Sequence, residues 1–135
     1  MDDGGGLEAT AHAKAAREHV FGFNRITMWE RDRIPAETSD QLAEFADIAA
    51  AFPQAFSQLS STLEQALANQ VLSMDSMPDE SDPSMAIGVA RLHLEEARGL
   101  AVDLHKHLSA AHNATAHIIS QGVDDGQESM NWDQP

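Results

Sequence analysis

Cysteine and tyrosine are absent from this chain of 135 residues, and lysine and arginine together number only eight. The absence of cysteine excludes disulfide scaffolds, thiol catalysis, and zinc or iron–sulfur sites built on thiolates. The few basic residues stand against 22 acidic ones, which gives a net charge of −14. Nucleic acids and anionic membranes attract basic surfaces, so we expect neither of them to be a direct partner.

Long apolar runs are also missing. Runs such as residues 49–53 are far too short to span a bilayer. The first six residues are acidic and glycine-rich, without the basic and apolar regions of a secretion signal. We therefore expect a cytoplasmic protein, and the alanine-rich, lysine-poor composition suggests a bacterial source.

Apolar residues at helical spacing are what the chain does contain. Hydrophobic residues make up 42% of it, which is enough for one folded domain at this length. Prolines and glycines divide the chain into three helical stretches, residues 7–33, 38–73 and 84–121, with no competing strand signal. We predict one α-helical domain over residues 7–121, between a disordered segment at residues 1–6 and an acidic disordered tail at residues 122–135.

The two longer stretches carry apolar residues at alternating spacings of three and four, the period of a coiled-coil seam. A capping box at Thr38 is predicted to begin the first of them, and the unbroken heptad phase favours one helix kinked at Pro53. The other is predicted to begin with Asp82 as N-cap and Pro83 in the first turn, and to stop at Gly122. The predicted seam comprises Leu42, Phe45, Ala49, Phe52, Phe56, Leu59, Leu63 and Ala66, and then Ile87, Ala90, Leu94, Ala97, Ala101, Leu104, Leu108, Ala111, Thr115 and Ile118.

The polar, proline-containing segment 74–83 joins these two stretches and reads as a surface loop. Folding the chain back at this loop places residues opposite each other when their numbers sum to about 157. Large residues then face small ones, as Phe56 faces Ala101. We therefore predict an all-α fold: an elongated, coiled-coil-like antiparallel hairpin to which the N-terminal helix adds as the third member of a three-helix bundle. Apolar residues left outside the two seams offer a surface for this third helix, and they could equally receive a second copy, in a homodimer or higher oligomer.

Charge is unevenly distributed along the chain. Residues 1–34 hold five of the eight basic residues, whereas residues 34–90 contain nine acidic residues and no basic one. The acidic stretch is explained most simply as a solvated face. Two sharper alternatives remain open: the arginine-bearing first segment docks on it, in cis or from a neighbouring chain, or its carboxylates mimic nucleic-acid phosphates. The acid density looks low for mimicry.

The seven histidines do not form a recognised ligand set. Asp103 and His107 can share a helix face, as can His93 and Glu96, but neither a di-iron nor a zinc-protease motif is present. No nucleophile elbow or phosphate-binding loop is present either. We therefore expect no metal, no cofactor and no enzymatic activity. His105 and His112 recur at seven residues, a spacing typical of helix-interface edges, and protonation near pH 6 would strengthen a contact with a partner's acids.

These patterns favour a non-enzymatic, acidic interaction and oligomerisation module, an accessory or adaptor protein that binds itself and a basic or helical partner. The alternative is an acidic, DNA-mimic-like inhibitor or regulator of a nucleic-acid-binding protein. A distant third is a metal-dependent helical-bundle enzyme that uses Asp103, His107 and His93. The residues expected at the interaction surface are Phe23, Ile26, Trp29, Arg31, Arg33, Glu37, Asp40, Glu44, Asp47, His105 and His112.

Overall fold

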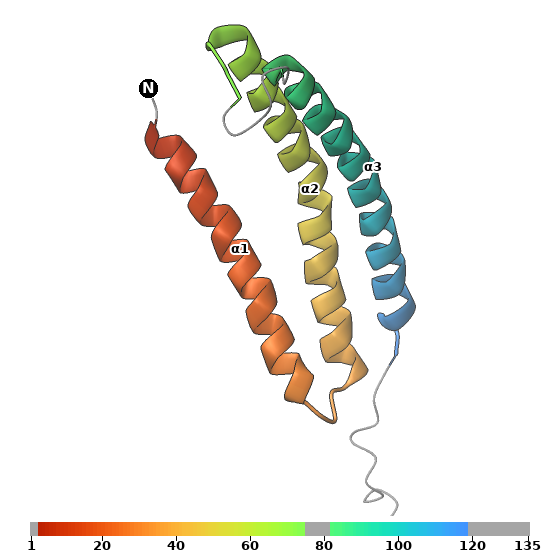
Figure 1. The fold of residues 1–135 in the computed structure, drawn as a ribbon. Coiled ribbons are helices and arrows are strands. Elements are labelled where there is room, and N and C mark those ends of the chain that lie inside the picture. Colours follow the sequence, from red (N-terminus) through yellow and green to blue (C-terminus); the bar gives the residue numbers. More distant parts are fainter. Residues whose placement is uncertain (1–2, 75–81, 119–135) are drawn as a thin grey trace, which may run out of the picture. The chain divides into compact units, whose positions relative to one another are not determined.

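The protein is all-α, as predicted. A computed structural model describes residues 3–74 and 82–118, which form three helices and no strand (Figure 1). Helix α1 spans Asp3–Trp29, α2 spans Pro35–Asn69 and α3 spans Pro83–Thr115. Within the described residues, no helix has the length and apolar character needed to cross a membrane. The predicted acidic tail, residues 122–135, lies outside the described residues.

The chain divides into two compact units, with the boundary between Arg33 and Ile34, and each is described by itself. The sequence does not predict this division. The first unit is α1, which already begins at Asp3, inside the segment expected to be disordered. It ends at Trp29, four residues before the predicted end. Asp32 follows in the left-handed backbone region, with φ of 59°, a conformation that a right-handed helix cannot contain.

Helix α2 opens the second unit and begins earlier than predicted. Pro35 lies in its first turn, where the missing N–H costs no hydrogen bond, so the capping box predicted at Thr38 is wrong. The helix is continuous through Pro53, as the unbroken heptad phase predicts. It ends at Asn69, four residues before the predicted end at Ser73.

Helix α3 begins as the sequence predicts. The carboxylate of Asp82 accepts a hydrogen bond from the backbone N–H of Ser84 at 3.0 Å, which makes Asp82 the N-cap, and Pro83 is the first helical residue. The helix ends at Thr115, six residues before the predicted residue 121. The predicted stop at Gly122 lies outside the described residues.

The two helices of the second unit form the predicted antiparallel hairpin, but in a different register. Side chains of α3 bond to α2 in three places, and the residue numbers of each pair sum to 151 instead of 157. The predicted pairing of Phe56 with Ala101 is therefore wrong. Most of the shift arises because α2 ends at Asn69, which moves the point at which the chain turns back. The pairs are Ser39 with His112, Ala46 with His105, and Ser60 with Arg91.

A narrow seam of small residues lies between α2 and α3. Among the described residues, the buried apolar side chains are Ala46, Ala49 and Ala101, and the buried polar one is Ser39. No large side chain is fully buried there. Small residues let two helices approach closely, but they remove little apolar area from water. The hairpin therefore leaves much of its apolar surface accessible.

Candidate interaction surface

A polar row on α3 faces a row of small residues on α2 across the seam. Both rows repeat every seven residues, so each keeps one position in the heptad along the whole hairpin. The long polar side chains on α3 are half-buried. The α3 row is Arg91, Arg98, His105 and His112, and the α2 row is Ser60, Pro53, Ala46 and Ser39.

Both histidines of this row bond to the backbone of α2. The Nδ1 atom of His105 lies 2.9 Å from the carbonyl oxygen of Ala46. The Nδ1 atom of His112 lies 2.9 Å from the carbonyl oxygen of Ser39 and 3.2 Å from its hydroxyl oxygen. A carbonyl oxygen only accepts, so Nδ1 carries the proton, in the neutral ring as well as in the charged one. The structure places both half-buried rings at the edge of the contact between α2 and α3, within one chain, whereas the seven-residue spacing leaves open whether the interface is with a partner.

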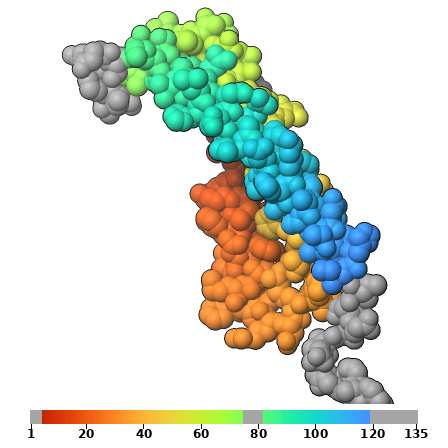
Figure 2. Space-filling model, turned by 90° about the vertical axis from the view of Figure 1, so that its right-hand side faces the viewer, coloured from red at the N-terminus to blue at the C-terminus, as the bar shows by residue number. Residues whose placement is uncertain are grey.

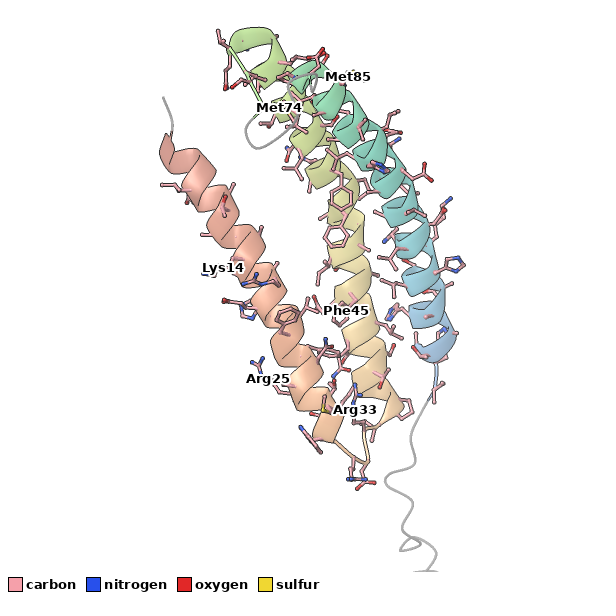
Figure 3. The ribbon with its side chains drawn as sticks, viewed as in Figure 1. Lys14, Arg25, Arg33, Phe45, Met74 and Met85 are labelled. Atoms are coloured by element: carbon pink, nitrogen blue, oxygen red, sulfur yellow. The ribbon has the colours of Figure 1, made fainter. Side chains whose placement is uncertain are left out.

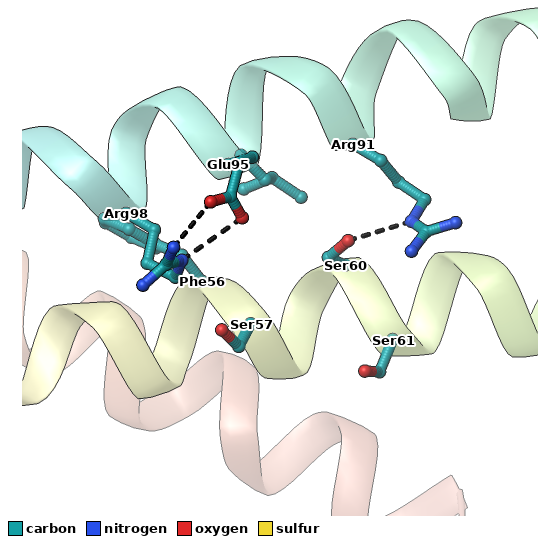
Figure 4. Close-up of a pocket in the computed structure, with 8 residues that line it drawn as sticks. Phe56, Ser57, Ser60, Ser61, Arg91, Glu95 and Arg98 are labelled. Atoms are coloured by element: carbon teal, nitrogen blue, oxygen red, sulfur yellow. Dashed lines mark hydrogen bonds and ion pairs between the residues drawn. The ribbon is translucent and has the colours of Figure 1, made fainter.

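The two arginines of the row border an open cleft of about 210 Å³ between α2 and α3 (Figure 4). Arg91 Nε donates to the hydroxyl oxygen of Ser60 at 2.9 Å, and Arg91 Nη2 lies 3.2 Å from a carboxylate oxygen of Glu64. Arg98 donates to both carboxylate oxygens of Glu95, and this hydrogen-bonded pairing holds the pKa of Glu95 below its ordinary value. Each guanidinium is matched by a carboxylate, so the cleft presents no surplus charge that would attract an ionic ligand.

The same cleft has no catalytic arrangement among its lining residues. Ser57, Ser60 and Ser61 come from consecutive turns of α2, and no histidine lines the cleft beside them to act as a base. In residues 3–74 and 82–118, no group of three or more His, Asp or Glu side chains is placed to hold a metal ion. Asp103 and His107, named above for a metal, are both exposed.

Four of the predicted interaction residues come together as an acid row on α2. They are spaced by three, four and three residues, so they share one side of the helix, and all four are exposed. Helix α2 contains no lysine or arginine. Acids in the first turns are also stabilised by the helix dipole, which helps to explain why this stretch is helical from its first residue. The acid row is Glu37, Asp40, Glu44 and Asp47.

A second apolar row of α2 begins where the acid row ends, turned around the helix from it because Ile48 directly follows Asp47, and we call it the outer α2 face: Ile48, Phe52, Ala55 and Leu59. Ile48 is 43% exposed and Leu59 is 53% exposed. The sequence assigns Phe52 and Leu59 to the seam with α3, and this is wrong for Leu59. Phe52 stacks on Phe56 with ring centroids 5.5 Å apart. In the sequence, the stretch from Ile48 to Leu63 contains no charged residue, and this could have indicated that α2 has an apolar surface in addition to its seam with α3.

Helix α3 also exposes large apolar side chains, and Figure 2 shows it, in teal to blue, running along the face of the molecule that is turned to the viewer. Met85, Val89 and Leu92 are 68%, 53% and 73% exposed. Their spacing of four and three residues puts them on one side of α3, away from the seam. Further along that side stand Glu96 and Asp103, both exposed, so the apolar stripe is interrupted by carboxylates.

The predicted residues of the first unit lie at the C-terminal end of α1 and just beyond it. Ile26 and Trp29 are 63% and 75% exposed, and Phe23 is half-buried. Arg31 is exposed, whereas Arg33 pairs with Glu30 at 3.1 Å. Figure 3 shows Lys14, Arg25 and Arg33 within this unit. The first unit is thus a helix with basic and apolar side chains that water can reach.

The described residues define a helical protein built on an antiparallel hairpin, with a seam that satisfies its own polar groups and with apolar and acidic surfaces outside it. Comparison of the chain with family models, curated proteins and solved structures finds no match.

Proposed function

We propose that this protein is a non-enzymatic interaction and oligomerisation module, an accessory or adaptor that associates with itself and binds a basic or helical partner. The observation that carries the proposal is the thin hairpin core, in which, among the described residues, only small side chains are buried and the larger ones are half-buried or exposed. Large apolar side chains remain accessible on all three helices.

A thin core favours association because a chain loses conformational entropy when it folds, and buried apolar area has to offset that loss. Fixing the backbone costs roughly 1–2 kcal/mol per residue, and fully burying a leucine or phenylalanine returns about 1.5–3 kcal/mol. Leu59 is 53% exposed and Leu92 is 73% exposed, so each returns only a fraction of that amount. Helices with such faces gain stability by packing against a further surface. A partner, or another copy, supplies that surface.

The distribution of charge on the hairpin supports a basic partner. The acid row stands on a helix without a basic residue, and the two arginines of the hairpin, Arg91 and Arg98, are paired with Glu64 and Glu95, which leaves Lys106 on α3 as its other lysine or arginine. A basic surface is the complement that such a row selects, by faster encounter and by rejection of acidic partners.

Phosphate mimicry is supported less well. The acid row spans eleven residues, or about 15 Å from first to last at 1.5 Å per residue, so its carboxylates follow one another at roughly 5 Å. A DNA duplex presents one phosphate per about 1.7 Å of its axis. Beyond Asp47 the helix carries no charge until Glu64. A protein that reads long runs of phosphates would meet only a short stretch of charge here.

Light scattering at two protein concentrations, coupled to size-exclusion chromatography, tests the self-association. We expect a mass above 14.6 kDa that rises with concentration. Affinity capture with the full chain from the native host, in low and high salt, tests the basic partner, which should be lost at high salt. A mass that stays at 14.6 kDa together with no salt-sensitive partner would contradict the proposal.

A further inference from the structure

We infer that α2 binds one helix of another protein, lengthwise, and that this helix is apolar along one half of its length, which packs on the outer α2 face, and basic along the other half, which lies along the acid row. This inference rests on the proposed function and names the surface and the partner chemistry for it. It concerns one helix of the second unit, from Glu37 to Leu59.

The outer α2 face has the geometry of a helix-binding seam. Ile48, Phe52, Ala55 and Leu59 are spaced by four, three and four residues, the alternation that a packed helix meets along a coiled coil. All four side chains are exposed. The small Ala55 lies between bulky neighbours, which leaves room for a partner's side chain to insert. A peptide helix in a groove is recognised by such anchors.

Charge is segregated along the length of α2, and this sets the partner's pattern. Four exposed carboxylates occupy the first part, up to Asp47, and no charged residue follows until Glu64. A partner with basic residues throughout would place charges over apolar side chains at no gain. A helix that is basic through one half and apolar through the other matches both parts. From Glu37 to Leu59 the surface is about 33 Å long, so the partner helix needs about 22 residues.

A second copy of the same surface is a poorer occupant. Two α2 helices that pack in parallel would set the two acid rows against each other. In the antiparallel arrangement each acid row would lie beside the uncharged half of the other copy, so no carboxylate would gain a cation. The basic helix is the occupant that complements both halves of α2.

The test uses the full chain and a synthetic peptide. The probe is a 22-residue helix with arginine at heptad spacing through one half and leucine at heptad spacing through the other. A control peptide replaces each arginine by glutamate. Binding is measured by calorimetry at low and at moderate salt. We expect binding of the arginine peptide, weakened by salt, and no binding of the glutamate peptide.

Matched variants locate the binding surface. Replacing Glu44→Gln and Asp47→Asn together should weaken peptide binding about fivefold, since exposed ion pairs each contribute a few tenths to one kcal/mol. The control pair on α3 is Glu96→Gln and Asp103→Asn, which removes the same charge from exposed positions and should leave binding within about twofold.

The apolar half is tested in the same way. Leu59→Gln on the outer α2 face should weaken binding about tenfold, because the peptide buries the half of this side chain that is now exposed. The control, Leu92→Gln on α3, changes a side chain that is 73% exposed and should have little effect. Circular dichroism of each variant confirms that the helices are retained.

The outcomes separate this inference from the proposed function. If the arginine peptide binds but the α2 variants and the α3 controls behave alike, the surface is wrong and the interaction module stands. If the peptide does not bind at all, α2 does not take a basic helix from another protein, whether because α1 or a second copy occupies it. If light scattering and affinity capture also fail, the proposed function fails with it.

Discussion

Two glycines inside α3 lower the stability of the hairpin, and its packing shows no reason for a glycine at either position. Gly88 and Gly99 lie in the interior of α3, and both are exposed. A β-carbon built on either one meets no atom within 4 Å. Alanine in these positions would therefore add a methyl group to open space. Gly88→Ala and Gly99→Ala should each stabilise the hairpin.

The expected size follows from helix propensity. Glycine in a helix interior is about 0.8–1.0 kcal/mol less favourable than alanine, because the unfolded glycine has more backbone freedom to lose. The two positions are eleven residues apart, which is about 16 Å along α3, so their effects should add. The double variant should gain about 2 kcal/mol. For a unit of this size, each kcal/mol raises Tm by roughly 4–8 °C.

Urea unfolding followed by circular dichroism measures this gain, at a protein concentration low enough that association does not contribute. The matched control is Ala110→Gly, at another exposed position of α3, which should lose about 1 kcal/mol. A double variant that is no more stable than the natural chain, while Ala110→Gly behaves as expected, would refute the reasoning and show that the backbone at Gly88 or Gly99 is in contact with something else.

Three further predictions concern the polar contacts of α3. Asp82→Ala removes the N-cap bond to Ser84 and should cost about 1 kcal/mol in urea unfolding, with Asp82→Asn costing much less. A double-mutant cycle of Ser60→Ala and Arg91→Met should show a coupling energy of about 0.5–1.5 kcal/mol, and additive effects would mean that the 2.9 Å bond contributes nothing. Arg98 lowers the pKa of Glu95, so their pairing stabilises the fold above the ordinary carboxyl pKa of 4.5, and this stabilisation is lost as the pH falls through the lower pKa of the folded state. Glu95→Gln should therefore slightly flatten the acid side of a plot of unfolding free energy against pH. An unchanged plot would mean that the pair is absent in solution.

The helices themselves follow from local chemistry, so the sequence predicts them well. Asp82 followed by Pro83 marks the start of α3 correctly, because an N-cap and a first-turn proline depend only on adjacent residues. The same local logic fails for the start of α2, where Pro35 competes with the capping box at Thr38 and the helix begins at the proline. Local signals therefore establish that a helix is present more reliably than where it ends.

Of the candidate surface, the sequence alone identifies the acid row, since acids spaced by three and four residues on any helix share one side. It does not assign His105 and His112, because spacing cannot say whether an interface edge lies within one chain or between two. The hydrogen bonds to Ala46 and Ser39 decide this in favour of the hairpin.

By itself, the sequence determined the all-α class, the antiparallel hairpin and the concentration of acid on its first helix, since composition and the three-four period are properties of the chain alone. Only the tertiary structure decided the register and the side of α2 that meets α3. Two apolar rows with the same period run along α2, one through Ala49 and Phe56 and the other through Ile48 and Leu59. Periodicity cannot choose between them. The choice follows from packing, because the small residues Ser39 and Ala46, beside the first of these rows, let α3 approach and bond to the α2 backbone, and this leaves the row of Ile48 and Leu59 exposed.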